Sequence, residues 1–423
     1  MTDRETILRL LPLYILAAAL PVSLSVASTC TGLVLVAAII VAVRERSRAA
    51  WPPRAVLLAL TALVAVYLVS VLAAPPAPRH WHKFGEELWI KLMLVAIPVL
   101  VGGRVRHLPR LIGVTLVAGG VASLFGIWQH FSGIDPLRGG RSLMTEWGHN
   151  SAAAFFGHHL SWGGQLLILI LMLAAWLLFT SWRRARLWLV LLLALHGLAL
   201  AWSYARSPLL GVAVGFVVLV LLLRGRRRLL GAALLVVPAL ASLALPEMRL
   251  HLERLTWMHR HETRLNLWES SLEGIAARPL TGWGPGNFDV MMAGHEVSGY
   301  YEVRAHSHND LLMHGVNAGL PGILAAVALL VAVCWVLFRA WRRGGSRAWL
   351  AAGALAVQAG ITMAGMFQVY QTDDEVEMLL YVVLGLALAA AGNCQETTGV
   401  RHWAGSRSAQ PVGPETTPLR EDE

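Results

Sequence analysis

Residues 152–180 read AAAFFGHHLSWGGQLLILILMLAAWLLFT, with no Lys, Arg, Asp or Glu among them. A helix of about 20 apolar residues spans the hydrocarbon core of a bilayer. Backbone in lipid must satisfy its own hydrogen bonds, so we predict that this stretch is a transmembrane helix. The basic run SWRRAR follows at 181–186, and such a cluster at one end of an apolar run is typical of the cytoplasmic face.

The same pattern repeats along the whole chain. Of its 423 residues, 56% are hydrophobic and only 14% are charged, whereas a soluble domain carries about a quarter charged residues. We therefore predict an all-α integral membrane protein with about twelve transmembrane helices. The apolar runs fall near 7–24, 27–43, 55–73, 87–102, 111–130, 152–180, 187–203, 208–223, 229–245, 318–338, 348–367 and 376–392.

The basic clusters predict the orientation of these helices. With the N-terminus inside, every even-numbered crossing up to the tenth is followed by a cluster, as the positive-inside rule requires. The clusters account for much of the net charge of +10, so this charge does not indicate nucleic-acid binding. Both termini are then cytoplasmic. The clusters are Arg44, Arg46, Arg48 and Arg54; Arg104, Arg106 and Arg110; Arg183, Arg184 and Arg186; Arg224, Arg226, Arg227 and Arg228; and Arg339, Arg342, Arg343 and Arg347.

The runs also predict the domain organisation. We expect nine transmembrane helices in 1–245, a periplasmic loop at 246–317 with short helices, three more transmembrane helices in 318–392, and a disordered cytoplasmic tail at 393–423. The N-terminal run carries Asp3 and Glu5 and its apolar character resumes through Val43, so we expect two uncleaved helices rather than a signal peptide. Three cysteines without CxxC spacing predict neither a disulfide framework nor a zinc site.

Two arginines are predicted on the outer side, where the positive-inside rule gives no reason for them. Arg206 lies in the short turn SYARSP, 203–208, and Arg264 lies near the start of an amphipathic stretch in which Leu265, Trp268 and Leu272 share one side. This stretch predicts a helix on the membrane surface. A guanidinium group suits bidentate contact with phosphate oxygens. The alternatives are an arginine that meets lipid phosphate and an ordinary solvated arginine.

Two further motifs lie in the long loop. GWGPGNF, 282–288, predicts a sharp structural turn and is not a P-loop, because no Lys-Ser/Thr pair follows it. AHSHNDLL, 305–312, places His308 and Asn309 at the start of a helix that enters the membrane. Interfacial histidines and a metal site formed from His295, His306, His308 and His314 are the alternatives, although His-x-His spacing alone is a poor metal signal.

Taken together, these motifs resemble the O-antigen ligase and polymerase family of bacterial membrane glycosyltransferases. The resemblance covers the whole topology and is sharpest at 203–211 and 262–322. It implies a GT-C-like arrangement of helices, no metal and no other cofactor. It also implies transfer of a glycan from an undecaprenyl-pyrophosphate carrier to an acceptor, which is lipid A-core in the ligases. Membrane lipid is the remaining partner, and no nucleic acid is implied.

The resemblance further implies the roles of individual residues. Arg206 and Arg264 match the family's essential arginines and His308 matches its essential histidine. Family members often carry a glutamate shortly after the His-Asn pair, where this chain has His314 and Gly315. Whether a carboxylate assists His308 therefore stays open. The substrate-binding residues that we predict are Arg206, Arg264, His306, Asn309, Trp268, Arg138, Arg141 and Arg79.

This chemistry agrees with the residue types. A lipid pyrophosphate leaving group develops negative charge, which arginines at the membrane surface stabilise at any working pH. A sugar hydroxyl needs a general base, and we expect His308 to serve as one, in an inverting attack on the anomeric carbon. Arg138, Arg141 and Arg79 in outer segments could capture the phosphates of lipid A-core, or could contact ordinary anionic lipid.

Three other functions stay open at this point. An O-antigen polymerase and a protein O-oligosaccharyltransferase would use the same donor with a different acceptor. A flippase for the lipid-linked glycan would be a transporter and would need charged residues inside its helices, of which Lys91 is the main candidate.

Overall fold

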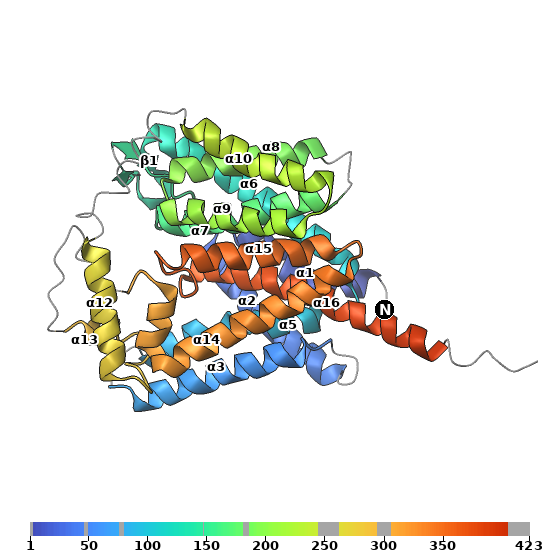
Figure 1. The fold of residues 1–423 in the computed structure, drawn as a ribbon, viewed down its shortest axis with the longest axis horizontal. Coiled ribbons are helices and arrows are strands. Elements are labelled where there is room, and N and C mark those ends of the chain that lie inside the picture. The colour runs from blue at the N-terminus through green and yellow to red at the C-terminus, as the bar shows by residue number, and fades with distance from the viewer. Residues whose placement is uncertain are drawn as a thin grey trace, which may run out of the picture.

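The computed structural model describes residues 3–45, 50–75, 80–146, 148–180, 186–243, 262–293 and 306–404. Long helices lie side by side in a bundle, with α12, α13 and the short strands at the left-hand end in Figure 1. The helices are α1 Asp3–Ala19, α2 Leu24–Arg44, α3 Arg54–Ala73, α4 His80–Trp89, α5 Met93–Val101, α6 Leu108–Ser132, α7 His159–Phe179, α8 Arg186–Ser203, α9 Arg206–Leu222, α10 Arg226–Leu243, α12 Glu262–Ala277, α13 Phe288–Met291, α14 Asp310–Arg343, α15 Ala348–Ala364 and α16 Asp374–Ala404.

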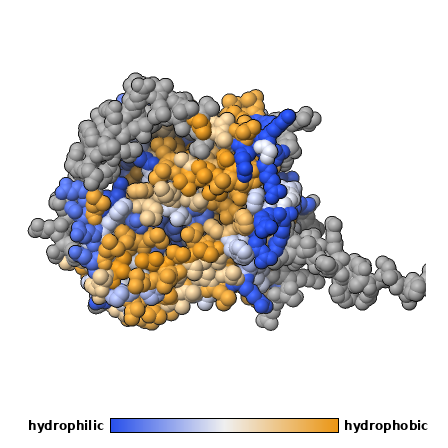
Figure 2. All heavy atoms as spheres, in the orientation of Figure 1, coloured by the Kyte–Doolittle hydropathy of each residue, from blue (hydrophilic) through white to orange (hydrophobic). Residues whose placement is uncertain are grey.

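The chain is a multi-pass membrane protein. Among the described residues, seven helices are long and apolar enough to cross a bilayer, and α9 and α15 are shorter apolar helices. Figure 2 shows a broad apolar surface over the sides of the bundle, with hydrophilic residues gathered towards its two ends. The seven candidate spans are α2, α3, Val105–Ser132 with α6, α7, α8, α14 and the Asp374–Gly392 part of α16.

The core of the bundle is formed by α7 and α16. The apolar window of α7 is 94% buried and that of α16 is 89% buried, whereas that of α2 is only 33% buried. A helix that is apolar on every side and covered by its neighbours belongs to the interior, and helices such as α2 and α8 turn their outer sides towards lipid. Ile39 on α2 and Trp188 on α8 are 63% and 72% exposed.

Two predicted runs differ from the helices that the structure contains. The run near 87–102 is broken, because α4 ends at Trp89 and α5 begins at Met93. At the break the buried Lys91 ammonium donates to the Glu377 carboxylate at 2.5 Å. The run at 152–180 becomes helical only at His159, because Gln129 bonds the backbone of the preceding segment at Ala153 and Ala154.

Helix α14 begins eight residues before the predicted run at 318–338 and bends where that run starts. Ala318 and Gly319 have non-helical backbone angles, and Gly319 has a φ of 66°. The loop GWGPGNF satisfies carbonyl groups released by the bend: Trp283 N donates to Val316 O at 2.8 Å and Gly284 N donates to Asn317 O at 3.0 Å. The structure therefore supports a structural role for this glycine-rich turn.

Two short hairpins follow α6. Strand β1, Ile134–Asp135, pairs antiparallel with β2, Arg141–Ser142. Strand β3, Thr145–Glu146, pairs antiparallel with β4, His149–Asn150. The 3-10 helix η1, Val105–His107, precedes α6. The 3-10 helix η2, Pro136–Arg138, joins β1 to β2. Strands β1 and β4 pack against α6.

The contact between Gly282 and the bend in α14 yields a stability prediction. A Cβ atom at residue 282 would lie 2.6 Å from the backbone nitrogens of Ala318 and Gly319, and the φ of Gly282 is +65°. We expect Gly282→Ala to lower the free energy of unfolding by about 1–3 kcal/mol, as strained backbone does. The measurement is the thermal unfolding midpoint of the purified protein in detergent.

A matched control is Gly197→Ala in α8, where an added Cβ meets no atom within 4 Å. Alanine is the better helix former, so this variant should unfold at the wild-type temperature or slightly above it. Equal midpoints for Gly282→Ala and Gly197→Ala would contradict the role assigned to the glycine-rich turn.

Candidate functional site

Residues 365–373, between α15 and α16, form the floor on which the predicted motifs meet. The Asp310 side chain at the start of α14 accepts hydrogen bonds from Tyr370 N at 2.9 Å and Gln371 N at 3.1 Å. Asp310 N in turn donates to Gly365 O at 2.8 Å. Gly365 has no room for a side chain, because a Cβ atom there would collide with the Asp310 carboxylate. The His-Asn-Asp motif is thereby fixed against this floor.

Asn309 adds two further attachments. Its side-chain oxygen accepts from Leu312 N at 3.0 Å and caps α14, as expected of an asparagine before a helix. Its amide nitrogen donates to Met366 O at 3.1 Å. Asn309 is buried, and both of its polar ends have protein partners. The structure therefore gives Asn309 a positioning role, where the sequence predicted that it binds substrate.

His308 is held in one orientation. Its φ is +51°, in the left-handed region that is uncommon for a residue other than glycine and that often marks functional sites. Its Nδ1 lies 2.5 Å from the Gln368 Oε1. An amide oxygen only accepts, so Nδ1 carries the hydrogen and Nε2 keeps its lone pair. The result is an imidazole with a defined tautomer, whose Nε2 can accept a proton.

The surroundings of His308 favour this neutral form. Burial, followed by the nearby His306, Arg264 and His158, lowers the pKa of His308 to about 4, against the opposing Gln368 hydrogen bond. Burial likewise lowers the pKa of His306. The pKa of His158, which precedes α7, is lowered to about 4 by burial and then by His159 and His306. Three imidazoles therefore share a partly dry environment in which each is neutral at pH 7.

Helix α12 brings Arg264 and Trp268 to the same place. Arg264 is close enough to His308 to lower its pKa, and it also opposes the rise that burial causes in the pKa of Tyr370. The Trp268 ring lies 6.3 Å from that of Phe367. Trp268 thus turns towards the floor, while Leu265 and Leu272, with which it was predicted to share one side, are 45% and 57% exposed.

Three buried polar atoms at the site have no hydrogen-bond partner among the described residues. They are Trp268 Nε1, His306 Nδ1 and Asp310 Oδ2. An unpaired polar atom that is buried costs about 1–3 kcal/mol, so such atoms need an explanation. The rings of His306 and His308 meet edge to face, with centroids 4.2 Å apart. A polar ligand next to His308 would supply the missing partners.

Helix α9, whose first residue is Arg206, meets the floor from a different direction. The next residue, Ser207, lies with its hydroxyl 3.0 Å from the Tyr370 hydroxyl. The preceding turn is fixed because His159 Nδ1 lies 2.7 Å from Ser203 O. The helices that carry Arg206, Arg264 and His308 therefore all meet residues 367–371.

Of the three outer arginines that were predicted to capture phosphates, the structure describes Arg138 and Arg141. Arg138 donates to the buried Asp135 carboxylate at 2.8 Å, and Arg141 lies 3.9 Å from the same carboxylate. Arg141 also donates to Gly157 O at 3.5 Å, beside His158. The Asp135 carboxylate is thus shared by two guanidinium groups, and the Glu375 carboxyl also interacts with Arg138 and with the Gly157 backbone. Arg79 lies outside the described residues.

The sequence analysis missed Gln368, Tyr370, His158 and Asp373. Asp373 accepts from the Ser161 hydroxyl at 2.6 Å and from the backbone of Glu375 at 3.1 Å, so it joins α7 to the start of α16. The local signals were a His-His pair before an apolar run and a polar stretch, QVYQTDDE, between two apolar runs. The partner that orients His308 is an amide, and Asp310 is engaged with backbone instead.

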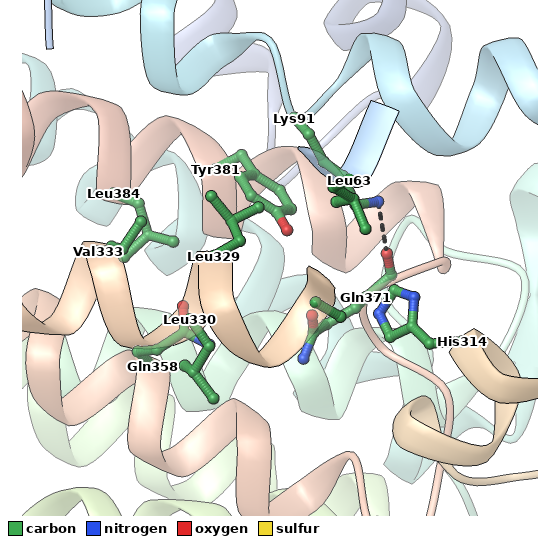
Figure 3. A pocket seen from close by; sticks show the side chains of 11 residues that line it. Leu63, Lys91, His314, Leu329, Leu330, Val333, Gln358, Gln371, Tyr381 and Leu384 are labelled. Carbon is green, nitrogen blue, oxygen red and sulfur yellow. Dashed lines mark hydrogen bonds between the residues drawn. The ribbon is translucent and has the colours of Figure 1, made fainter. Parts of the chain in front are cut away.

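His314 lines a cavity inside the bundle. Its Nδ1 lies 2.6 Å from the Tyr67 hydroxyl. The cavity is small and has apolar walls of Leu63, Leu329 and neighbouring side chains. Figure 3 shows the Lys91 ammonium pointing to the Gln371 backbone oxygen at its polar end, a distance of 3.3 Å. The cavity adjoins the floor at residue 371.

A metal site is not formed by the described residues, since no three His, Cys, Asp or Glu side chains among them are grouped to hold an ion. His295, which the sequence analysis included in the metal alternative, lies outside the described residues. The arrangement offers instead a neutral imidazole with two arginine-bearing helices beside it. Such a set can accept a proton and stabilise an anion without further groups.

Comparison with known proteins adds one finding. Residues 190–327, from α8 into α14, match the sequence profile of a family described as O-antigen ligase. The matched range includes Arg206, Arg264 and His308. No curated protein sequence matches the chain.

The environment of His308 predicts its protonation behaviour. Its pKa of about 4 means that the imidazole stays neutral and nucleophilic down to a pH well below 6.5. The measurement is the rate at which diethyl pyrocarbonate carbethoxylates His308, followed by peptide mass spectrometry. We expect this rate to be the same at pH 5.5 as at pH 7. Arg264→Ala removes one of the charges that lower the pKa of His308, so in this variant the rate should begin to fall at a higher pH.

A rate that halves near pH 6.5 in the wild-type protein would contradict the environment described for His308. Arg186→Ala at the start of α8 is the matched control. It removes an exposed guanidinium remote from the histidines and should leave the pH dependence of His308 unchanged.

Proposed function

We propose that the chain moves a glycan from undecaprenyl pyrophosphate to lipid A-core. The match of residues 190–327 to a family described as O-antigen ligase supports this proposal. Members of this family are membrane glycosyltransferase-like enzymes. The single observation that carries the proposal is the oriented, neutral His308, with Arg264 and the start of α9 on the same floor. Transfer from a lipid pyrophosphate requires a base for the acceptor hydroxyl and positive charge for the leaving group, and these residues supply both.

Arg206 and Arg264 are proposed to bind the donor pyrophosphate. Guanidinium groups hold their charge at every working pH and match phosphate oxygens in pairs. Arg206 is also the first residue of α9, where unpaired backbone N–H groups favour an anion. Trp268 Nε1 and His306 Nδ1 supply two further polar atoms for the sugar or the phosphate. The donor headgroup would therefore lie between α9, α12 and the His308 turn.

His308 is proposed to be the general base. Its Nε2 removes the proton from an acceptor hydroxyl while that oxygen attacks the anomeric carbon of the donor sugar. The bond from this carbon to the pyrophosphate oxygen breaks on the opposite face, so the configuration inverts. The bonding electrons leave with the pyrophosphate, whose negative charge the two arginines stabilise. The proton then passes from His308 to water, which restores the base.

We further propose that the site faces the periplasm and that both termini are cytoplasmic. The supporting observation is that α2 and α14 carry arginines in their last turns, Arg44 and Arg342–Arg343, while α14 begins at the site. The positive-inside rule puts those arginine ends in the cytoplasm. Twelve crossings in a GT-C-like arrangement, with one large periplasmic loop, complete the proposal.

Arg138 and Arg141 are proposed to attract the phosphates of the acceptor. Their shared carboxylate, Asp135, is buried, while the Arg141 side chain is 56% exposed. An exposed guanidinium with only a partial counter-charge steers an anionic substrate. Arg79 stays a prediction for the same role.

The buried position of Lys91 favours an enzyme over a flippase. Lys91 was the main candidate for a transport path, but its ammonium is paired with Glu377 and donates to the Glu87 backbone oxygen at 2.5 Å. A residue bound in this way joins α4, α5 and α16 instead of facing a moving substrate. Polymerase and protein O-oligosaccharyltransferase activities differ from ligase activity only in the acceptor, so the acceptor decides among the three.

Transfer by the purified protein in lipid vesicles, with EDTA present, tests the proposal. The donor is undecaprenyl-pyrophosphate glycan, and the acceptor arms are lipid A-core, a second carrier-linked glycan and a periplasmic protein. We expect product only with lipid A-core. Product only with the carrier-linked glycan or only with the protein would replace the ligase by the corresponding alternative.

The same assay predicts the effect of removing the base. His308→Ala should lower kcat by about a hundredfold to ten-thousandfold, the range that general bases contribute. Arg206→Ala and Arg264→Ala should each lower kcat/KM for the donor. Full activity of His308→Ala would remove this residue from the mechanism, and wild-type activity of both arginine variants would refute the pyrophosphate site.

Gln368 predicts a more specific change. In Gln368→Glu a carboxylate faces the His308 Nδ1–H and favours the protonated imidazole, so the pKa of His308 rises. The acid limb of the kcat profile should then move to higher pH. Gln368→Ala should lower kcat with little change in KM, because the imidazole loses its orientation. Unshifted profiles in Gln368→Glu would show that residue 368 does not act on the base.

A further inference from the structure

A stack of four aromatic and imidazole rings lies beside the turn that carries Arg206. Trp202 and His130 are parallel to within 11°, with centroids 5.3 Å apart. His130 lies 6.0 Å from Tyr204, and Tyr204 lies 5.7 Å from His149 with an interplanar angle of 8°. The order of the stack is therefore Trp202, His130, Tyr204, His149. None of these residues was assigned a role by the sequence analysis or by the proposed mechanism.

The backbone holds these rings rigidly. His130 Nδ1 lies 2.8 Å from Asn150 O, and the Asn150 side chain donates to His130 O at 2.9 Å, so α6 and β4 are bound to each other in both directions. Ala152 N donates to Trp202 O at 3.1 Å and adds α8. Tyr204 has a φ of +55°, which few residues other than glycine adopt. The rings are thus organised before any ligand arrives.

The position of the stack relates it to the donor site. Tyr204 is two residues from Arg206, and Ser207 lies against the floor at Tyr370. The other end of the stack, His149, lies in β4 of the second hairpin and is exposed. The stack therefore leads from the start of α9 to the hairpins. A chain of sugars linked to a pyrophosphate held by Arg206 could follow this direction.

The chemistry of the stack suits sugars better than lipid. His130 and Tyr204 have a ring on each side, so a pyranose can pack its C–H face on the outer face of an end ring, such as the exposed His149, and can meet the inner rings only at their polar edges. Two of the four rings are imidazoles, whose nitrogens exchange hydrogen bonds with hydroxyl groups. Trp202, His130 and Tyr204 are half-buried. Side chains that only anchored the protein among lipid acyl chains would not need the imidazole groups of His130 on α6 and His149 on β4.

We propose that Trp202, His130, Tyr204 and His149 form a carbohydrate subsite that binds sugar rings of the donor glycan beyond the sugar attached to the pyrophosphate. This inference rests on the proposed function, because it assumes a lipid-linked glycan as donor. The subsite takes neutral or acidic pyranose rings. Arg138 and Arg141, on the adjacent hairpin, supply the positive charge that acidic sugars require.

The first test measures binding of a glycan that has neither lipid nor pyrophosphate. The probe is the oligosaccharide released by mild acid from the carrier lipid of the same cells, titrated into the wild-type protein in detergent by calorimetry. His149→Ala removes the exposed end of the stack, and we expect a fivefold to tenfold weaker Kd. His82→Ala on α4, another exposed histidine, is the matched control and should bind as wild type does.

Tyr204→Phe separates the ring from its hydroxyl. Because the ring stays in the stack, the Kd of the Tyr204→Phe variant for the oligosaccharide should remain within about twofold of wild type. Tyr204→Leu should weaken binding as His149→Ala does. Equal binding by wild type, His149→Ala and Tyr204→Leu overturns the proposal. Absence of any binding by the wild-type protein overturns it as well.

The second test compares two donors in the transfer assay, one with a single sugar on undecaprenyl pyrophosphate and one with several repeat units. His149→Ala should raise KM fivefold to tenfold for the long donor and leave KM for the short donor unchanged. An equal rise with both donors would show that the stack serves Arg206 or the membrane interface, and it would overturn the subsite. If no donor is transferred yet free oligosaccharide binding depends on His149, the proposed function fails and the subsite stands.

Discussion

The site depends on one buried carboxylate, that of Asp310. The segment between α15 and α16 leaves helical geometry inside a membrane protein, and its backbone N–H groups need acceptors that lipid cannot provide. Asp310 accepts from two successive amides, Tyr370 N and Gln371 N, and its own N–H returns a hydrogen bond to Gly365 O. This exchange fixes the start of α14 against residues 365–371. The orientation of His308 and the approach of α9 and α12 both follow from it.

A second exchange of the same kind supports the first. The bend at Ala318 and Gly319 frees carbonyl groups of α14, and the turn that contains Trp283 and Gly284 supplies the missing donors. The short first part of α14 is thereby separated from its long membrane-spanning part. Because Val316 O, Asn317 O and Leu320 N have backbone partners, the non-helical bend can persist within α14. A rigid site can therefore be built at the end of a bundle of otherwise regular helices.

The sequence predicted what local composition determines and missed what distant residues determine. Apolar runs such as 187–203 and 208–223 appear as α8 and α9, because each needs only its own residues to bury its backbone. The break at Lys91 depends on Glu377, 286 residues away, so no local pattern could reveal it. Arg264 and His308 were recognised by their motifs. Gln368 was not recognised. It lies 60 residues after His308, in a segment without a motif, so the short bond that orients His308 could not be predicted.

The arginines and the histidine of the site are not independent features. A guanidinium group that stabilises a pyrophosphate leaving group also disfavours a second positive charge nearby, and Arg264 lowers the pKa of His308 in this way. The histidine is therefore neutral when the donor is absent. A bound pyrophosphate would offset the arginine charge and raise the proton affinity of His308 at the moment when a proton has to be accepted. Donor binding would in this way prepare the base, through charge alone and without movement of the chain.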